Sequence, residues 1–460
     1  MKKLLPFLLF SAFTFTTARA QITVGNTLVD TATVASNLNV PWELVWGPDN
    51  FIWMTERFGR ISRVNPANGQ VTPLITITEV QTTSEGGLLG MALHPDFANN
   101  PYVYTVYTYS SGSTILEKVV RFTYNGSSLG SPFVLLDNII GANVHDGSRL
   151  LILPDNTLLV STGDAANSST SQNQNSLNGK ILRMNLDGTI PANNPTPGSY
   201  VYSYGHRNPQ GLTRSPGGTI YSSEHGASTD DEVNIIQPNR NYGWPTVEGL
   251  CNTPAEQTFC NTNNVAEPIA TWTPTVAPAG IIYYNNPAIP EWQNSVLLTT
   301  LKASKLVHLQ LNAAGTAVTA QTDYLTSRYG RLRAICQAPD GRIFISTSNR
   351  DGRTTPRATD DRIIVLRSRN ISGVKEKLRG ALQVYPNPAK QVVQVQFSNQ
   401  QKPLQLELFD LAGRQVKLQP VEQRKESVYF SVKDLLPGIY VLRAQEQENV
   451  YYQRLVVQPE

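Results

Sequence analysis

The chain has 460 residues, which exceeds the usual size of one compact domain and predicts a large domain followed by a small one. Its 38 basic and 35 acidic residues leave a net charge of +3 and form no basic stripe, so the composition argues against a nucleic-acid partner. Beyond the N-terminal segment, no stretch approaches the roughly 20 apolar residues that cross a bilayer, and we expect no membrane span.

The first residues have the pattern of a secretory signal peptide. Two lysines precede an apolar core over residues 4–17, and the segment Ala18–Ala20, with a small residue at each end, suits a cleavage site. We therefore expect residues 1–20 to be removed on export and the mature chain to begin at Gln21.

A turn that contains Pro with Asp, Asn or Gly, followed by a short β-prone run, recurs along most of the remaining chain. The six copies lie roughly 45 to 75 residues apart, and helical periodicities are few. This spacing is typical of four-stranded propeller blades and predicts an all-β fold, a six-bladed β-propeller over residues 21–366. A generic all-β domain whose turns happen to use the same residues is the alternative. The copies begin at Gly47, His94, Pro154, Ser215, Ile289 and Ala338, and the copy at Ile289 is a weakened form that keeps only the proline.

Three short polar segments interrupt the apolar runs of this region. They are His145–Arg149, Tyr204–Gly211 and Ser223–Ala227, and together they carry imidazoles, guanidinium groups, amides and carboxylates. Binding residues concentrate in loops that a rigid scaffold positions. We expect the three segments to converge on one ligand.

The chain contains three cysteines. Cys251 and Cys260 are close enough to close a small loop, and in an oxidising compartment we expect a disulfide that contributes roughly 2 to 3 kcal/mol. Cys336 lies in an apolar run and is interpreted as an inert buried thiol.

After a closing strand at residues 362–366, the polar segment 367–380 has the composition of a linker. Residues 381–460 then show short alternating strands separated by turns, which predicts a small C-terminal β-sandwich. The predicted strands include 392–397, 404–409, 428–432 and 439–443.

Residues 36–366 resemble the soluble pyrroloquinoline quinone (PQQ)-dependent glucose and aldose sugar dehydrogenases. The matching motifs are spread over all the predicted blades. They are Trp46–Asn50 with Thr55–Arg57, Gly87–Gly90 with His94–Phe97, Gly205–Leu212, Asp230–Glu232, Asn241–Pro245, Pro274–Pro278, Leu301–Lys302, Arg331 and Arg333.

The resemblance implies a PQQ- and calcium-dependent enzyme that oxidises the C1 hydroxyl of aldoses to lactones. The reaction needs a hydride acceptor that no side chain supplies, and the chain lacks the glycine-rich fingerprint of a nicotinamide enzyme. By the same resemblance, His145 is the general base, Asp164 orients it, and Arg207 stabilises the charge that develops on the quinone. An aldose and an external electron acceptor are the implied reaction partners.

The resemblance also implies which residues bind the cofactor and calcium. Carbonyl oxygens of Gly226 and Ala227 are expected to bind a calcium ion that bridges to PQQ, and Glu232 with the backbone of Tyr242 a second, structural calcium ion. PQQ carries three carboxylates, so cations and hydrogen-bond donors are expected around it. The predicted cofactor-binding residues are Glu85, His145, Arg207, Asn208, Thr275, Lys302, Arg331 and Arg333.

Three positions depart from the pattern of the glucose enzymes. Glu85 and His225 stand where glutamine is common, and Ala227 stands where proline is common. These departures favour a broad aldose dehydrogenase over a strict glucose enzyme. Two other functions stay open from the sequence: a propeller lactonase, and a non-catalytic propeller that binds a protein or polysaccharide.

The tail from residue 381 resembles the C-terminal sorting domain of the type IX secretion system. The likeness rests on Tyr385–Pro388, Asp410–Arg414 and Leu436–Tyr440. It implies the secretion machinery as a partner and a final location outside the cell, either secreted or at the cell surface. A carbohydrate-binding β-sandwich is the alternative for this tail.

Overall fold

The computed structural model describes residues 20–369, 382–397, 405–410, 414–423, 427–446 and 449–459. Contacts within the chain divide it into two compact units, residues 1–371 and 372–460, which we describe separately. Apart from Ala20, the predicted signal peptide lies outside the described residues, as do residues 370–380 of the predicted linker.

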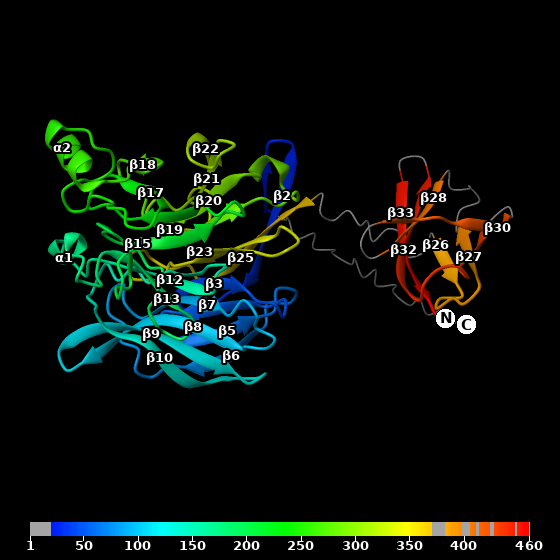
Figure 1. Cartoon of the computed structure of the whole chain (residues 1–460), viewed down its shortest axis with the longest axis horizontal. Helices are drawn as coiled ribbons and strands as arrows, with labels where there is room; N and C mark the ends of the chain where they lie inside the picture. The colour runs from blue at the N-terminus through cyan, green and yellow to red at the C-terminus, as the bar shows by residue number, and fades with distance from the viewer. Residues whose placement is uncertain are drawn as a thin grey trace, which may run out of the picture. The chain divides into compact units, whose positions relative to one another are not determined.

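The regular secondary structure of the first unit is almost entirely antiparallel strand, which confirms the predicted all-β fold (Figure 1). Its described strands form one five-stranded and five four-stranded sheets. In spatial order the sheets are β1 (Ala20–Val24), β2 (Thr27–Ala35), β25 (Ile363–Ser368), β24 (Ile343–Thr347), β23 (Leu332–Gln337); β3 (Pro41–Trp46), β4 (Ile52–Glu56), β5 (Arg60–Val64), β6 (Val71–Thr76); β7 (Leu88–Leu93), β8 (Tyr102–Ser111), β9 (Thr114–Tyr124), β10 (Leu129–Ile140); β11 (Leu150–Ile152), β12 (Thr157–Thr162), β13 (Lys180–Asn185), β14 (Val201–Tyr204); β15 (Pro209–Arg214), β16 (Ile220–Glu224), β17 (Asp231–Ile236), β18 (Ala270–Trp272); and β19 (Pro278–Tyr284), β20 (Ser295–Thr300), β21 (Leu306–Leu311), β22 (Val318–Tyr324).

The sheets are arranged in a closed ring. The first strands β3, β7, β11, β15, β19 and β23 contact one another in this order, and β23 contacts β3. Each pair of neighbouring sheets shares a cluster of buried apolar side chains. Representative pairs, one for each interface, are Met54 and Phe344, Trp53 and Val103, Tyr104 and Val160, Leu159 and Ile236, Tyr221 and Val307, and Leu297 and Ile364.

The repeated turn of the sequence occupies one structural position. Each of the six copies joins the first strand of a sheet to the second, as between β3 and β4 or between β23 and β24. The repeat therefore marks the same connection in every sheet. Because the connection recurs, the segments that lead into the first strands all lie at the opposite end of the ring.

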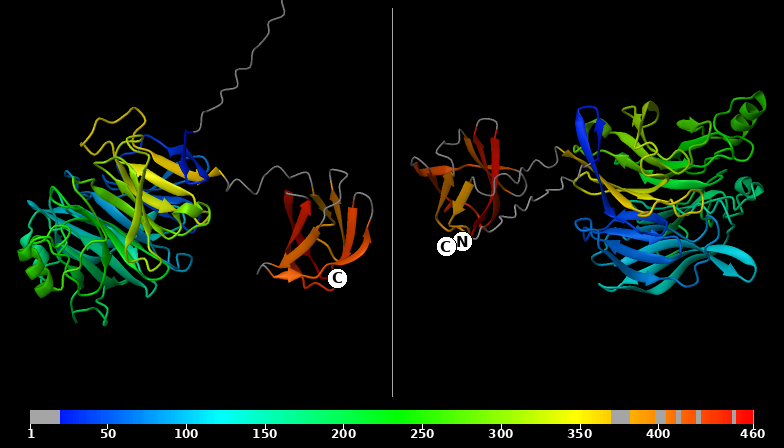
Figure 2. Two further views of the ribbon diagram at one scale, coloured as in Figure 1. Left: turned by 90° about the horizontal axis from the view of Figure 1, so that it is seen from above. Right: turned by 180° about the vertical axis from the view of Figure 1, so that it is seen from behind.

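The N-terminal strands close the ring. β2 pairs with β25, with Thr31 opposite Leu366, and Figure 2 shows the blue N-terminal hairpin beside the yellow strands from the end of the unit. The sequence had placed the end of the propeller at residue 366, but Arg367 and Ser368 still belong to β25. The predicted linker therefore begins two residues too early.

The loop after β17 carries the exposed helix α2 (Pro254–Asn263). Thr253 and Glu256 form a capping box at its start, and Asn264 ends it in the left-handed conformation. The predicted disulfide joins Cys251 to Cys260 across this helix. Burial raises the pKa of the Cys336 thiol, as expected for an inert core residue. Two other short helices are α1 (Ser169–Gln172) and η1 (Pro290–Trp292).

The second unit contains two four-stranded antiparallel sheets in its described residues. Apolar side chains of both sheets, such as Val393 and Phe430 from one and Leu408 and Leu442 from the other, form one core cluster. The sequence missed β29, β30 and β33. In spatial order the sheets are β26 (Leu382–Tyr385), β27 (Val392–Phe397), β31 (Ser427–Ser431), β30 (Gln419–Gln423); and β29 (Gln415–Val416), β28 (Gln405–Asp410), β32 (Gly438–Glu446), β33 (Asn449–Val457).

We predict that Val29→Ala lowers the free energy of unfolding of the first unit by about 1 to 3 kcal/mol, because it removes two methyl groups from the core that seals the ring. Val29 is fully buried in β2 and packs in the cluster that contains Ile364 and Leu366. Urea unfolding followed by tryptophan fluorescence reports on this unit alone, since all six tryptophans lie in it. Thr33→Ala, at an exposed position of β2, is the control and should change stability by less than about 0.5 kcal/mol. Equal stability of the two variants would contradict a sealing role for Val29.

Candidate active site

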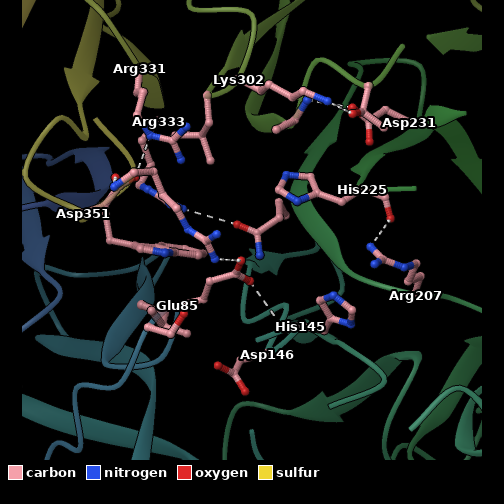
Figure 3. Close-up of a pocket in the computed structure, with 18 of the residues that line it drawn as sticks. Glu85, His145, Asp146, Arg207, His225, Asp231, Lys302, Arg331, Arg333 and Asp351 are labelled. Carbon is pink, nitrogen blue, oxygen red and sulfur yellow. Dashed lines mark hydrogen bonds and ion pairs between the residues drawn. The ribbon is translucent and has the colours of Figure 1, made fainter. Parts of the chain in front are cut away.

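A cavity of about 390 Å³ opens at the end of the ring where the chain enters the first strands (Figure 3). Every sheet contributes to its lining, because residues in or just before each first strand reach it. In ring order these contributors are Trp42, Glu85 and Leu89, His145 and Asp146, Arg207 and Gln210, Thr275 and Ala277, and Arg331 and Arg333. Residues from all three polar segments of the sequence line this one cavity, so the segments meet as predicted, while a shared ligand stays a prediction.

Most of the predicted cofactor and metal residues line the cavity. They are Glu85, His145, Arg207, Gly226, Ala227, Thr275, Lys302, Arg331 and Arg333. Four predicted site residues do not line it: Asp164, Asn208, Glu232 and Tyr242. The first two contact lining residues, and the other two line a separate small cavity.

The lining is rich in positive charge. Six cationic side chains, Arg57, Arg207, Lys302, Arg331, Arg333 and Arg353, face four carboxylates, Glu85, Asp146, Asp231 and Asp351.

Two of these carboxylates are already bound within the protein. Asp231 accepts backbone N–H bonds from Gly226, Val276 and Ala277, and Asp351 pairs with Arg331 at 2.8 Å. The excess of cations suits an anionic ligand.

His145 and Asp164 form a hydrogen-bonded pair. His145 Nδ1 lies 2.8 Å from Asp164 Oδ1, and because a carboxylate accepts, Nδ1 carries the proton and Nε2 is free to act as a base. Gly163 lets the two loops approach, since a Cβ there would lie 1.7 Å from the carbonyl oxygen of His145. The imidazole is thus oriented by a buried carboxylate, as a general base requires.

Glu224 fixes the backbone beside Arg207. Its Oε1 accepts the N–H groups of Arg207 and Asn208, and its Oε2 lies 2.9 Å from His206 Nδ1. The side-chain oxygen of Asn208 accepts from Gly147 N at 3.1 Å, which ties two of the polar segments together. Among the described residues, Arg207 Nε and Asn208 Nδ2 are buried without a hydrogen-bond acceptor.

Besides Arg207, the cavity contains the cationic side chains of Arg333, in β23, and Lys302. Arg333 is 5 % exposed, donates to Ser348 Oγ and Gln210 Oε1 at 3.2 and 3.3 Å, and lies over the Trp42 ring. Burial lowers the pKa of Arg333 to about 9. Lys302 donates to the hydroxyl of Thr275 across the cavity rim.

The two departures from glutamine both face the cavity. Glu85 Oε2 accepts the backbone N–H of His145 at 3.2 Å, and its other oxygen lies 3.6 Å from Arg353. Burial lowers the pKa of His225, and Arg333 and Arg207 act in the same direction. The Nε2 atom of His225 is buried and has no partner among the described residues.

Glu232 and Tyr242 line a small second cavity of about 10 Å³, together with Glu224, Asp230 and Glu248. Burial and the charge of Glu224 raise the pKa of Glu232 to about 8. Both Glu232 oxygens already accept hydrogen bonds, from Gly249 N and Asn234 Nδ2. In the described part of the chain, no group of three or more His, Cys, Asp or Glu side chains is arranged to hold a metal ion.

A buried pair of carboxyl groups lies beside His145, and no role was predicted for it from the sequence. Glu117, in the middle of β9, and Asp146 are both almost fully buried, and each has one oxygen without a hydrogen-bond partner among the described residues. Burial and the neighbouring Asp146 raise the pKa of Glu117, and burial raises the pKa of Asp146 to about 7. The adjacency of Asp146 to His145 was the only signal in the sequence.

A closed ring of antiparallel sheets whose loops gather an imidazole–carboxylate pair and several arginines defines an all-β enzyme with a site for an anionic ligand. The family model of Glucose / Sorbosone dehydrogenase matches residues 38–357. The chain belongs to this family, and the predicted family and enzyme class, a sugar oxidoreductase, are confirmed. The model of the Secretion system C-terminal sorting domain matches residues 383–458, as the tail motifs predicted.

Relatives and solved structures agree with this family. The chain is 32% identical over 402 residues to quinoprotein glucose dehydrogenase B of Acinetobacter calcoaceticus, covering 68% of this chain and 84% of the relative. It is 29% identical to aldose sugar dehydrogenase YliI of Escherichia coli, over 70% of this chain and 91% of the relative. The PQQ-bound aldose sugar dehydrogenase of Streptomyces coelicolor matches with a TM-score of 0.66 and 36% identity, covering 74% of this chain and 98% of that one.

We predict that Glu117→Gln flattens the pH dependence of stability. With raised pKa values the native pair keeps protons that the unfolded chain releases above about pH 4, so stability falls as pH rises toward 7. The glutamine amide removes one acid and can donate to Asp146. At pH 8 the variant should therefore be at least about 1 kcal/mol more stable than the wild type, and near pH 4 the two should be equal.

Urea unfolding between pH 4 and 8 measures this difference. Asp323→Asn, at an exposed position, is the control and should leave the slope of stability against pH unchanged. A variant with the same slope as the wild type would show that the pair holds no extra proton.

Proposed function

We propose that the protein is a PQQ- and calcium-dependent aldose sugar dehydrogenase that oxidises the C1 hydroxyl of aldoses to lactones. The observation that carries the proposal is the meeting of the His145–Asp164 pair with Arg207, Lys302, Arg331 and Arg333 at one cavity. In the same proposal the six sheets of the first unit are six propeller blades and the two sheets of the second unit form a β-sandwich.

The donor set of the cavity fits PQQ. A planar quinone with three carboxylates needs cations and hydrogen-bond donors, and the cavity holds six cationic side chains. The buried Nε of Arg207 and Nδ2 of Asn208, unpaired within the described residues, need acceptor oxygens. When bound, PQQ supplies the hydride acceptor that side chains cannot supply.

In this proposal Lys302, Arg331 and Arg333 bind carboxylate and quinone oxygens, and Thr275 adds its hydroxyl. Arg207 and Asn208 donate to the reactive end of the quinone, where Arg207 stabilises negative charge. Glu85 lies beside the base and contributes to the choice of sugar.

His145 is the proposed general base. Its Nε2 takes the proton from the sugar hydroxyl, and the imidazolium that forms is stabilised by the carboxylate of Asp164 at 2.8 Å. Asp164 therefore acts through His145, while His145 contacts the substrate.

Calcium is part of the proposal at two places. The carbonyl groups of Gly226 and Ala227, which line the cavity, would hold the ion next to the cofactor. Glu232, with the backbone carbonyl of Tyr242, would hold the structural ion in the small second cavity. A cation there would favour the charged form of Glu232 and offset the burial that raises its pKa.

We also propose that the protein is exported through the type IX system and is secreted or held at the cell surface. The match of residues 383–458 to a secretion sorting domain supports this location. Among the described residues, no helix is both long and apolar enough to cross a membrane.

Reconstitution tests the proposal directly. The purified apoprotein, given PQQ and calcium, should oxidise aldoses with an artificial dye as electron acceptor, and should be inactive when either PQQ is omitted or calcium is chelated. A panel of pentoses and hexoses compared with lactones separates a dehydrogenase from a lactonase. Lactone hydrolysis without PQQ, or no turnover of any aldose, would defeat the proposal.

The second test changes the base. His145→Gln should lower kcat about 10²- to 10⁴-fold, because glutamine cannot take a proton, while the affinity for PQQ in a spectroscopic titration stays within a few-fold. His94→Gln, a histidine outside the cavity lining, is the matched control and should keep wild-type turnover. Wild-type kcat in the His145 variant would remove this residue from its role.

A further inference from the structure

Trp244 contacts both halves of the candidate active site. Its indole Nε1–H donates to Asp164 Oδ2 at 2.9 Å, and its ring lies 5.3 Å from the guanidinium carbon of Arg207. The sequence placed Trp244 only in the motif Asn241–Pro245 and gave it no role. Trp244 thus contacts both Asp164, which pairs with the proposed base His145, and Arg207, whose guanidinium faces the cavity.

The carboxylate of Asp164 depends on the indole for its second oxygen. Oδ1 accepts from His145 Nδ1 at 2.8 Å and from Ala166 N at 2.9 Å, and among the described residues Trp244 is the donor that reaches Oδ2. Asp164 is 1 % exposed, so water cannot replace that donor without a rearrangement. With both oxygens bound, the carboxylate cannot rotate away from the imidazole.

The backbone of Trp244 is itself held in place. Its N–H donates to Gly205 O at 3.0 Å, and its carbonyl oxygen accepts from Gln172 Nε2 at 2.7 Å. Gln172 and the buried Asn241 exchange two further side-chain hydrogen bonds, at 2.8 and 2.9 Å. Gly205 has φ of +78°, and a Cβ there would lie 2.1 Å from Asn241 Oδ1, so only glycine fits at this position beside the Gln172–Asn241 pair.

The ring of Trp244 limits where Arg207 can point. Arg207 donates from Nη1 to His225 O at 3.2 Å on one side and faces the indole on the other. A cation held against an aromatic face is stabilised most where water is excluded. The Arg207 carbonyl also accepts the N–H of Asp164 at 2.8 Å, so backbone and side chains connect the same two residues.

We propose that Trp244 is a positioning residue that sets the orientation and charge distribution of the Asp164–His145 pair through its N–H and the direction of Arg207 through its ring. The inference rests on the proposed function, in which His145 is the base and Arg207 faces the cofactor. The N–H and the ring of Trp244 have separate roles in this proposal, and two substitutions can test them one at a time.

Trp244→Phe removes the N–H and keeps an aromatic face. Negative charge on Asp164 is then less dispersed and favours the imidazolium, so the titration midpoint of His145 should rise by about 0.5 to 1 pH unit relative to the wild type. The acid limb of kcat/KM should move by the same amount to higher pH, and kcat should fall about tenfold. The other charged groups beside His145 in the cavity, Glu85, Asp146 and Arg207, are unchanged in this variant.

Trp244→Leu removes the ring as well. It should reproduce the shift of the His145 midpoint and, in addition, weaken PQQ binding about tenfold in a titration of the apoprotein with calcium present, whereas Trp244→Phe should change this affinity less than about threefold. Trp272→Phe is the matched control. It removes an indole hydrogen bond of 3.1 Å to Gln321 Oε1 outside the cavity, and should leave midpoint, kcat and affinity unchanged.

Nuclear magnetic resonance of ring-labelled histidine measures the midpoint without turnover, since the chain has five histidines and His145→Gln identifies the signal. A wild-type midpoint and pH profile in Trp244→Phe would overturn the part of the proposal that concerns Asp164. Wild-type PQQ affinity in Trp244→Leu would overturn the part that concerns Arg207. If the wild type oxidises no aldose, the proposed function fails, and the midpoint still decides whether the indole acts on the pair.

Discussion

The pairing of β2 with β25 is the constraint on which the rest of the structure depends. Each sheet adds only one or a few side chains to the cavity, so the site exists only when the six first strands stand around a common axis. No covalent bond closes the ring of separate sheets. Hydrogen bonds between β2 and β25, the last strand of the first unit, close it instead. The buried cluster around Val29 and Ile364 then fixes that junction by excluding water.

Charge balance explains why the site is built from many long-range contacts. The six cationic side chains that line the cavity would repel one another unless nearby groups held the guanidinium and ammonium groups apart. Asp351 does so for Arg331, and although burial alone would raise its pKa, Arg331 and Arg333 hold the pKa of Asp351 below the usual value. Gln210 and Ser348 hold Arg333 in place by accepting hydrogen bonds with their neutral side-chain oxygens. The cations are thus ordered before any ligand arrives, which lowers the entropy cost of binding.

The sequence predicted those parts of the structure that local chemistry determines. The six turns were visible because each contains a proline, which five of them combine with Asp, Asn or Gly, and the polar segments around His145 and Arg207 stood out against apolar strands. The Glu117–Asp146 pair was not predicted, because a lone glutamate in a strand does not reveal which face it occupies or what lies opposite. The contact of Trp244 with Asp164 spans 80 residues, and only the folded ring brings them together. The strand β29 has only two residues, which is too few for an alternating pattern to be recognised.

The junction of β2 and β25 also affects biosynthesis. Thr31 and Leu366 are neighbours in the sheet, yet 335 residues separate them along the chain, so β2 must wait for the last strand of the first unit before the two can pair. Such a high contact order slows folding, because a long loop must close, at a cost in chain entropy, before the two strands can pair. A nascent or prematurely terminated chain would meanwhile present β2 as an unpaired edge able to recruit other chains. The topology therefore requires that the edge of β2 stay protected until β25 has been made.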